Sequence, residues 1–280
     1  MPPILSHSRV TAPGAEPTRW LMVLHGIYGS GRNWATLARS LVGERPEWGV
    51  LLPDLRLHGA SAGFEPPHTL AAAAADVEAL VEALGLPLAV VLGHSFGGKV
   101  SLAYARHHPE RLEQVWVVDS TLEVREPSGS AWRVLEAVRS LPERLPSREA
   151  LAEGLAPFGY ERPMASWLAM NLERDGDFFR WRLDWDGVEA LLRDYFAVDL
   201  WDVVEDPPGS LEVHVVKATD SNSLRPEDVQ RVEAAGERTG RTFLHPVDGG
   251  HWINVDNPAG MLERLLEHLP PGTASAKNAP

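Results

Sequence analysis

The sequence predicts an α/β fold with a mostly parallel central sheet flanked by helices, from the composition of its strands and the helical patterns between them. Short apolar runs recur without alternation of polar and apolar residues, which is typical of strands buried on both faces of a parallel sheet. Helical patterns separate these runs, as in repeated β–α–β units. The expected strands are 20–25, 49–55, 88–94, 113–119, 211–218 and 242–247, and the expected helices are 33–41, 69–84, 96–107 and 258–268.

Residues 121–206 break this alternation. The stretch has helical patterns, few strand signals and many aromatic residues, so we expect a helical lid inserted before the seventh strand. Buried aromatic residues serve mainly in packing, but together they predict an apolar pocket. The α/β core is expected to comprise residues 1–120 and 207–269, and the Pro-, Gly- and Ala-rich stretch 270–280 to be a disordered tail.

Composition excludes several classes of function. The 280-residue chain has a formal net charge of −13 and no basic run, which argues against a nucleic-acid partner. It has no cysteine, so disulfides, thiolate catalysis and cysteine-ligated metal sites are excluded. We find no apolar run long enough to span a membrane and no signal-peptide pattern at the start, and therefore expect a cytoplasmic protein.

Residues 93–97 read Gly-His-Ser-Phe-Gly, the G-x-S-x-G pattern, between an expected strand and an expected helix. This pattern makes a sharp strand-to-helix turn that strains its central residue, and the flanking glycines remove Cβ clashes. The turn lifts the hydroxyl of Ser95 out of the sheet, and the helix that begins at Phe96 points its positive end at the same place. We therefore predict Ser95 as a nucleophile.

A serine hydroxyl needs a base, which in this setting is a histidine. His251 stands in Asp-Gly-Gly-His-Trp, after the last expected strand and before the final helix. The glycines let the loop turn and project the imidazole back over the sheet. Its late position also fits the chain order Ser…Asp…His that accompanies this pattern. We predict His251 as the base.

Two aspartates are candidates for the carboxylate that orients the base. Asp119 ends the strand 113–119, and Asp220 follows the strand 211–218. Either position can serve, and either residue could instead cap a helix or form a turn. The residues alone leave the two aspartates equally favoured.

Hydrolysis through a tetrahedral intermediate also needs backbone N–H groups aimed at the developing oxyanion. The residue after the nucleophile, Phe96, is expected to supply one. The loop after the first long strand should supply the other, and we assign it to Ile27. His25 and Gly26 belong to this supporting loop, in which Gly26 allows a close approach of the backbone.

Together these residues resemble the α/β-hydrolase superfamily across nearly the whole chain. More narrowly, the chain resembles the small esterases of the YbfF type and their mitochondrial abhydrolase relatives. The lid segment FRWRLDWDGVEALL (179–192) is also similar to a stretch of that group. The segments that carry the resemblance are LHGIYGSGRNW (24–34), PDLRLHGAS (53–61), GHSFGGK (93–99), VVDSTLEVREP (117–127) and GGHWINVDNP (249–258).

The resemblance also bears on which aspartate, Asp119 or Asp220, orients the base. In such esterases the aspartate after the sixth strand completes the triad, which favours Asp119, although here no proline follows it until Pro127. The segment KATDSNSL (217–224) is similar to a stretch of the same relatives in which an acid is usually absent. Asp220 stands in that segment here, so it remains the alternative. His58 and His94 are expected to support the site through hydrogen bonds.

The expected activity is that of a serine carboxylesterase or acyl-thioesterase, acting through an acyl-enzyme on a small-molecule ester or thioester of short to medium chain. Such chemistry requires no metal or organic cofactor. One alternative keeps the same triad for C–C bond hydrolysis or a lyase step of menaquinone synthesis. That alternative needs basic residues near the site, for which the lid offers Arg180, Arg182 and Arg193. A non-catalytic ligand receptor is a third reading. The sequence leaves the oligomeric state unknown.

Overall fold

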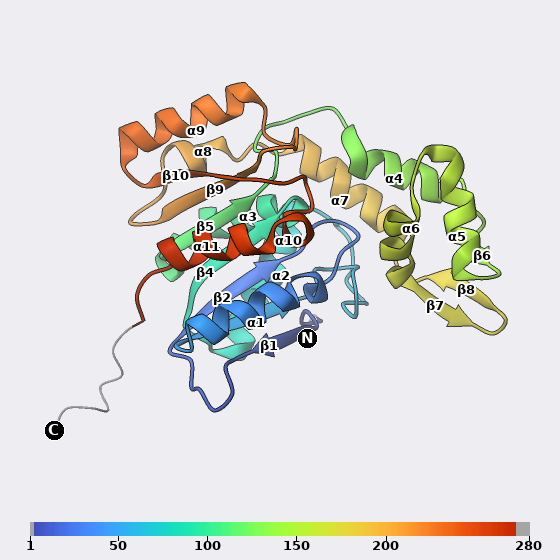
Figure 1. Cartoon of the computed structure of the whole chain (residues 1–280), viewed down its shortest axis with the longest axis horizontal. Helices are drawn as coiled ribbons and strands as arrows, with labels where there is room; N and C mark the ends of the chain where they lie inside the picture. The colour runs from blue at the N-terminus through green and yellow to red at the C-terminus, as the bar shows by residue number, and fades with distance from the viewer. Residues whose placement is uncertain (1–2, 273–280) are drawn as a thin grey trace.

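The computed structural model describes residues 3–272 and contains a seven-stranded sheet in the order β1–β3–β2–β4–β5–β9–β10. Each neighbouring pair is parallel except β1 and β3, which are antiparallel (Figure 1). The strands are His7–Val10 (β1), Arg19–Leu24 (β2), Trp48–Pro53 (β3), Leu88–His94 (β4), Gln114–Val118 (β5), Glu212–Ala218 (β9) and Thr242–Val247 (β10).

Helices cover both faces of this sheet, so the strands are buried on both sides. In β2, Leu21 and Val23 pack on one face, while Met22 and Leu24 pack on the other. The first face is covered by α1 and α11, and the second by α2, α3 and α9. These helices, with the short α10, are Ala35–Glu44 (α1), Leu70–Leu84 (α2), Phe96–His107 (α3), Pro226–Thr239 (α9), Ile253–Asp256 (α10) and Pro258–His268 (α11).

The predicted α/β architecture is confirmed, and several element boundaries agree to the residue. The helix expected over 69–84 begins at Leu70, and the Thr69 side chain caps it by accepting a hydrogen bond from Ala72 N at 3.1 Å. Three elements outside the segment 121–206 were not anticipated: β1, α9 and the short α10. Strand β1 has only four residues and lies exposed at the edge of the sheet, and α9 is polar over most of its length. Both therefore lack a strong hydrophobic pattern.

The segment between β5 and β9, which we call the insertion (residues 121–206), contains helices and a second sheet. This three-stranded sheet, in the order β6–β8–β7, was not expected in a helical lid. Its hairpin turns at Gly176, which has a φ of 62°, and the neighbouring Asp175 and Asp177 were the available turn signal. The elements are Gly129–Arg139 (α4), Arg144–Leu145 (β6), Arg148–Leu155 (α5), Arg162–Leu168 (α6), Leu172–Asp175 (β7), Phe178–Trp181 (β8), Trp185–Ala197 (α7) and Trp201–Glu205 (α8).

The insertion precedes β9, the sixth strand of the main sheet along the chain, one strand earlier than expected. In Figure 1 the hairpin β7–β8 and helices α5 and α6 project to one side of the core. No helix among residues 3–272 is long and apolar enough to cross a membrane. Of the predicted disordered tail, 270–280, residues 273–280 lie outside the described residues.

The strand order places a crevice at the carboxyl ends of β2 and β4. The chain adds β3 on one side of β2 and then returns to add β4 on the other side. In open α/β sheets, ligands bind where the strand order reverses in this way. The loop after β2 and the turn after β4 therefore lie where a site is expected.

Candidate active site

Ser95 occupies a strained turn between β4 and α3. Its φ of 53° and ψ of −117° lie in a region that side-chain-bearing residues seldom adopt. A Cβ on Gly93 would lie 2.0 Å from the carbonyl oxygen of Gly97, and a Cβ on Gly97 would lie 2.4 Å from that of Leu24. The turn therefore requires both glycines of the G-x-S-x-G pattern, as the sequence predicted. The Ser95 side chain remains half-buried at the floor of a cavity.

The imidazole of His251 lies against the carboxylate of Asp119. His251 Nδ1 donates to Asp119 Oδ2 at 2.7 Å, and the Asp119 side chain is fully buried. Burial alone would raise the pKa of Asp119, but hydrogen bonds from His251 and Ser221 outweigh it, so this pKa lies below its usual value. The carboxylate is therefore charged at neutral pH and fixes the tautomer of His251, leaving Nε2 as the free ring nitrogen.

Asp220 lines the polar side of the site but makes no hydrogen bond to His251. Its backbone N–H donates to the carbonyl of Gly249 at 2.9 Å, and its side chain is exposed to solvent. The residue next to it, Ser221, donates instead to Asp119 Oδ2, while Ser223 Oγ lies 3.2 Å from His251 Nδ1. Of the two candidate aspartates, the structure brings only Asp119 to the imidazole.

Two neutral histidines hold the loop after β2 in place. His25 Nε2 accepts a hydrogen bond from Leu55 N at 2.9 Å, and His58 Nε2 accepts one from Tyr28 N at 3.1 Å. Each ring also donates from Nδ1 to a backbone carbonyl, that of Gly26 for His25 and that of Arg56 for His58. Burial lowers the pKa of His25 to about 4. Burial and the neighbouring His25 lower the pKa of His58 to about 3, so both rings are uncharged at neutral pH.

The loop held in this way presents a free backbone donor. The N–H of Ile27 has no hydrogen-bond partner among residues 3–272. The N–H of Phe96 belongs to the first residue of α3, where no intrahelical acceptor exists. Ile27 lines the same cavity as Ser95, and Phe96 follows Ser95 directly. Both amides can therefore donate to an oxygen bound beside Ser95.

His94 connects the nucleophile turn to the loop that carries His251. Its Nε2 donates to the carbonyl oxygen of His251 at 2.7 Å, and the two ring centroids are 4.8 Å apart. Burial, with His251 nearby, lowers the pKa of His94 to about 3. A Cβ on Gly26 would lie 3.0 Å from His94 Nδ1, so this glycine allows the loop after β2 to approach His94 closely.

Two cavities meet at Ser95 and His251, and they differ in character. The first is small, about 40 Å³, and largely apolar. The second is about 450 Å³, and polar side chains form much of its wall. The apolar cavity is lined by residues that include Ile27, Tyr28, Trp34, Val134, Met164, Trp167 and Trp252. The polar cavity is lined by residues that include Thr121, Arg125, Ser130, Arg133, Asn222 and Ser223.

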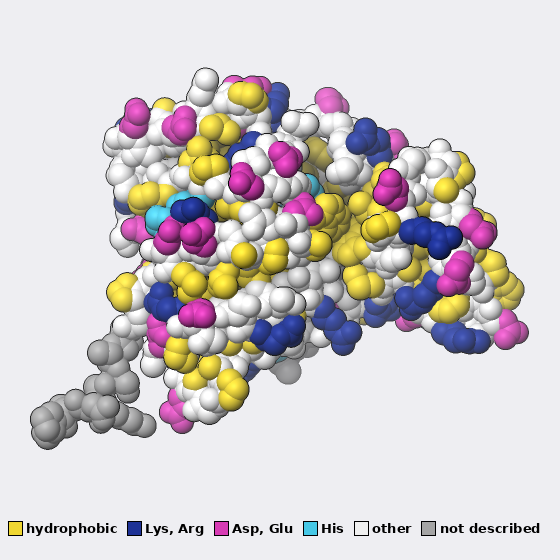
Figure 2. Space-filling model, in the orientation of Figure 1, with side chains coloured by type: hydrophobic (Ala, Val, Ile, Leu, Met, Phe, Trp, Pro, Cys, Tyr) yellow, Lys and Arg dark blue, Asp and Glu magenta, His cyan; other side chains and the backbone are white. Residues whose placement is uncertain are grey.

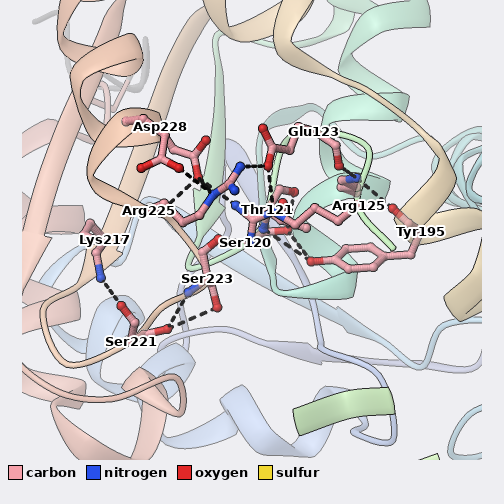
Figure 3. Close-up of polar contacts among 12 residues, drawn as sticks. Ser120, Thr121, Glu123, Arg125, Tyr195, Lys217, Ser221, Ser223, Arg225 and Asp228 are labelled. Atoms are coloured by element: carbon pink, nitrogen blue, oxygen red, sulfur yellow. Dashed lines mark hydrogen bonds and ion pairs between the residues drawn. The ribbon is translucent and has the colours of Figure 1, made fainter. Parts of the chain in front are cut away.

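A polar network ties the segment after Asp119 to the loop after β9 (Figure 3). Arg125 donates to Glu123 Oε1 at 2.8 Å, to Ser223 O at 3.1 Å and to Asp228 Oδ2 at 2.8 Å. The hydroxyl of Tyr195 reaches Ser120 and the N–H of Thr121, each at 3.3 Å. These contacts hold both loops that position the Asp119 carboxylate. The sequence analysis did not single out Ser221 and Ser223, although both belong to the segment 217–224 that resembled the esterases.

Lys99 is fully buried and anchors both ends of the insertion. Its Nζ donates to the carbonyls of Glu123 at 2.8 Å, Tyr195 at 2.7 Å and Val198 at 2.6 Å. Burial lowers its pKa to about 7, while three carbonyl acceptors match the three N–H groups of the ammonium form. No group of three His, Asp or Glu side chains suited to hold a metal ion occurs among the described residues.

Comparison with known proteins shows the family of this chain. A family model described as "alpha/beta hydrolase fold" matches residues 19–158. The chain belongs to the α/β-hydrolase fold family and is a hydrolase, as the sequence resemblance predicted.

Its relatives include lipases and esterases. The chain is similar to the sn-1-specific diacylglycerol lipase ABHD11 of Mus musculus, with 32% identity over 89% of this chain and 80% of the relative. The Danio rerio protein of the same name is 27% identical over 90% of this chain and 78% of the relative. A solved structure titled "Marine microorganism esterase" superposes with a TM-score of 0.81 at 22% identity, covering 95% of this chain and all (100%) of that one, which shows a shared fold.

Proposed function

We propose that this protein is a serine carboxylesterase or acyl-thioesterase that works through an acyl-enzyme. The contact between His251 Nδ1 and Asp119 Oδ2 at 2.7 Å carries the proposal, because it orients an imidazole in the cavity that Ser95 lines. The lipase names of the relatives support an ester substrate, because lipases hydrolyse esters.

In the proposed reaction, His251 Nε2 takes the proton of Ser95 Oγ as this oxygen attacks the carbonyl carbon of the ester. Asp119 stabilises the imidazolium that forms. The N–H groups of Ile27 and Phe96 donate to the tetrahedral oxyanion. His251 then protonates the leaving alcohol or thiol. Water attacks the acyl-enzyme by the reverse proton route, which releases the acid and restores Ser95.

The two cavities suggest how the substrate divides. An acyl chain suits the apolar cavity beside Trp167 and Trp252, and a polar leaving group suits the cavity beside Thr121 and Ser130. Thr121 lines this polar cavity, and its hydroxyl has no hydrogen-bond partner among the described residues. Since the apolar cavity holds about 40 Å³, chains longer than a few carbons must displace side chains that line it.

The proposal is tested with Ser95→Ala and 4-nitrophenyl esters of graded acyl length. We expect wild-type turnover and a loss of roughly a thousandfold or more in kcat in the variant. A fluorophosphonate should add covalently to one site in the wild type, detected by intact mass, and should leave Ser95→Ala unmodified.

Failure would take two forms. If Ser95→Ala retained wild-type turnover, Ser95 would not be the nucleophile. If the wild type hydrolysed neither esters nor thioesters, the esterase proposal would fail. C–C bond cleavage or ligand binding without turnover would then take its place.

A further inference from the structure

A second large cleft lies between the core and the insertion, and three arginines line it. We call it the arginine cleft and define it by Arg32 from the core and by Arg148 and Arg182 from the insertion. Its volume is about 500 Å³, and Ser30, Asn33 and Asn171 are among its polar walls. In Figure 2, Lys and Arg side chains follow the lower edge of the molecule from the core toward the hairpin β7–β8. This concentration stands out in a chain whose net charge is −13.

The three guanidinium groups are not neutralised. Among residues 3–272, none of them lies within ion-pair distance of a carboxylate. Arg148 donates to the carbonyls of Ala169 and Leu172, at 2.8 Å and 3.2 Å, which fixes its position without cancelling its charge.

The other charged and titratable groups in the cleft do not offset this excess. Arg182 donates to the carbonyl of Met170, and Arg32 makes no side-chain hydrogen bond within the described chain. The one carboxylate in the wall, Asp54, accepts backbone hydrogen bonds from Gly31 and Ala60, both at 2.8 Å. His7 also lines the cleft, and its Nδ1 bonds to Leu5 O.

The arginine cleft adjoins the apolar cavity beside Ser95. Tyr28, Gly29 and Asn33 line both spaces and form the wall between them. Asn171 donates to the carbonyl of Tyr28 at 2.8 Å, which holds this wall against the insertion. The arginine cleft therefore lies on the other side of Tyr28, Gly29 and Asn33 from the cavity that Ser95 lines.

We propose that the arginine cleft binds an anionic group, a carboxylate or a phosphate, at the far end of the acyl chain whose ester Ser95 attacks. The apolar cavity takes the methylenes, and the guanidinium groups take the charge by hydrogen bonds to its oxygens. This inference rests on the proposed esterase function and names its substrate class: esters of ω-carboxy or ω-phospho acids.

The test compares 4-nitrophenyl esters that differ only at the end of the acyl chain. The hemiester of adipic acid is paired with the hexanoate, and the hemiester of suberic acid with the octanoate. The 6-phosphonooxyhexanoate ester distinguishes phosphate from carboxylate. We expect kcat/KM to favour the anionic member of a pair at low salt. In Arg32→Ala/Arg182→Ala this preference should fall about tenfold, with the neutral ester unchanged.

Matched controls separate a site from general charge. Arg162→Ala/Arg174→Ala removes the same charge from exposed arginines of the insertion that do not line the cleft, and should keep the preference. Arg32→Lys/Arg182→Lys should keep part of the preference for the anionic ester, because the charge remains. Raising the salt concentration should increase KM for the anionic esters alone. An equal fall in the control double variant, or a fall produced by Arg133→Ala in the polar cavity, would overturn the proposal.

Binding of the free acid separates this inference from the esterase proposal. Calorimetry with adipate and with 6-phosphonooxyhexanoate needs no turnover, so it applies even if no ester is hydrolysed. We expect binding to the wild type and to the Arg162→Ala/Arg174→Ala control, and a loss of about tenfold in affinity in Arg32→Ala/Arg182→Ala. If neither acid bound the wild type, the arginine cleft would not be an anion site.

Discussion

The loops at the carboxyl ends of the main-sheet strands, which we call the sheet edge here, and the insertion are held by different kinds of contact. At the sheet edge, the uncharged rings of His25, His58 and His94 bond to backbone groups of the loops around Ser95. At the insertion, cationic side chains donate to backbone carbonyls. Lys99 holds both of its ends, and Arg148 holds the turn before β7.

This difference follows from two requirements: little net charge beside Ser95, and donors for the carbonyls at the ends of the insertion. The neutral rings place no net charge beside Ser95, where the charge of the transition state develops. Asp119 is therefore the carboxylate that stabilises the imidazolium of His251 when His251 takes the Ser95 proton. Cations, by contrast, suit carbonyl groups that would otherwise be buried without donors. The two regions should therefore respond to different substitutions, and three predictions follow the comparison in order of expected effect.

Asp119→Asn should have the largest effect, a fall of roughly ten-thousandfold in kcat for a 4-nitrophenyl ester, because the amide favours the wrong tautomer of His251. Asp220→Asn is the matched control and should change kcat less than about twofold, since its exposed side chain makes no hydrogen bond to the imidazole. Steady-state kinetics on both variants checks the prediction. The reverse pattern would assign the acid to Asp220.

Lys99→Met should loosen the insertion. Removing Nζ takes the donor from one buried and two partly buried carbonyls, and we expect a loss of about 3 kcal/mol in the free energy of unfolding. Limited proteolysis should cut first within residues 121–206. Lys217→Met serves as a control, because Lys217 also donates to carbonyls but is only half-buried. Denaturant unfolding of the two variants should differ, and equal losses would contradict the assigned anchor.

His58→Gln should change how stability depends on pH. The folded pKa of His58, about 3, lies below the ordinary value of 6.5, so the unfolded state binds the proton first as the pH falls. Each such histidine contributes stability that is fully present above pH 6.5 and is lost, at about 1.4 kcal/mol per pH unit, toward the folded pKa.

The measurement is the free energy of unfolding of the wild type and His58→Gln between pH 7.5 and 4.5. The variant should be less stable at pH 7.5 but should lose stability less steeply below pH 6.5. A slope equal to that of the wild type would mean that His58 protonates in the folded protein as readily as in water.

Much of the sheet edge was predictable from short sequence patterns, because local turns fix it. The need for Gly93 is local, because a Cβ there would clash with the carbonyl of Gly97. The need for Gly97 comes from Leu24 in the neighbouring strand, but the G-x-S-x-G pattern marks both positions. The choice between Asp119 and Asp220 was different. Both aspartates follow strands that end at the same edge, and only the contacts of Ser221 and His251 across the loops distinguish them.

The insertion was harder to predict because its elements depend on contacts between distant residues. Strand β6 pairs with β8 through residues 144–145 and 179–180, which lie far apart in the sequence. Neither strand has an alternating hydrophobic pattern that would predict it. The role of Lys99 was also hidden. Its partners are carbonyls 24 to 99 residues later in the chain, and no local pattern around Lys99 indicates them.

The anchoring of the insertion on Lys99 has a consequence for how such proteins diversify. The carbonyls of Glu123 and Val198 lie within 2.8 Å of the same nitrogen atom, so the chain leaves the core and rejoins it at nearly one point. A segment whose ends meet in this way can be exchanged as a cassette without moving the strands on either side. Substrate preference in this scaffold can thus be grafted between homologues, with Glu123 and Val198 as natural splice points.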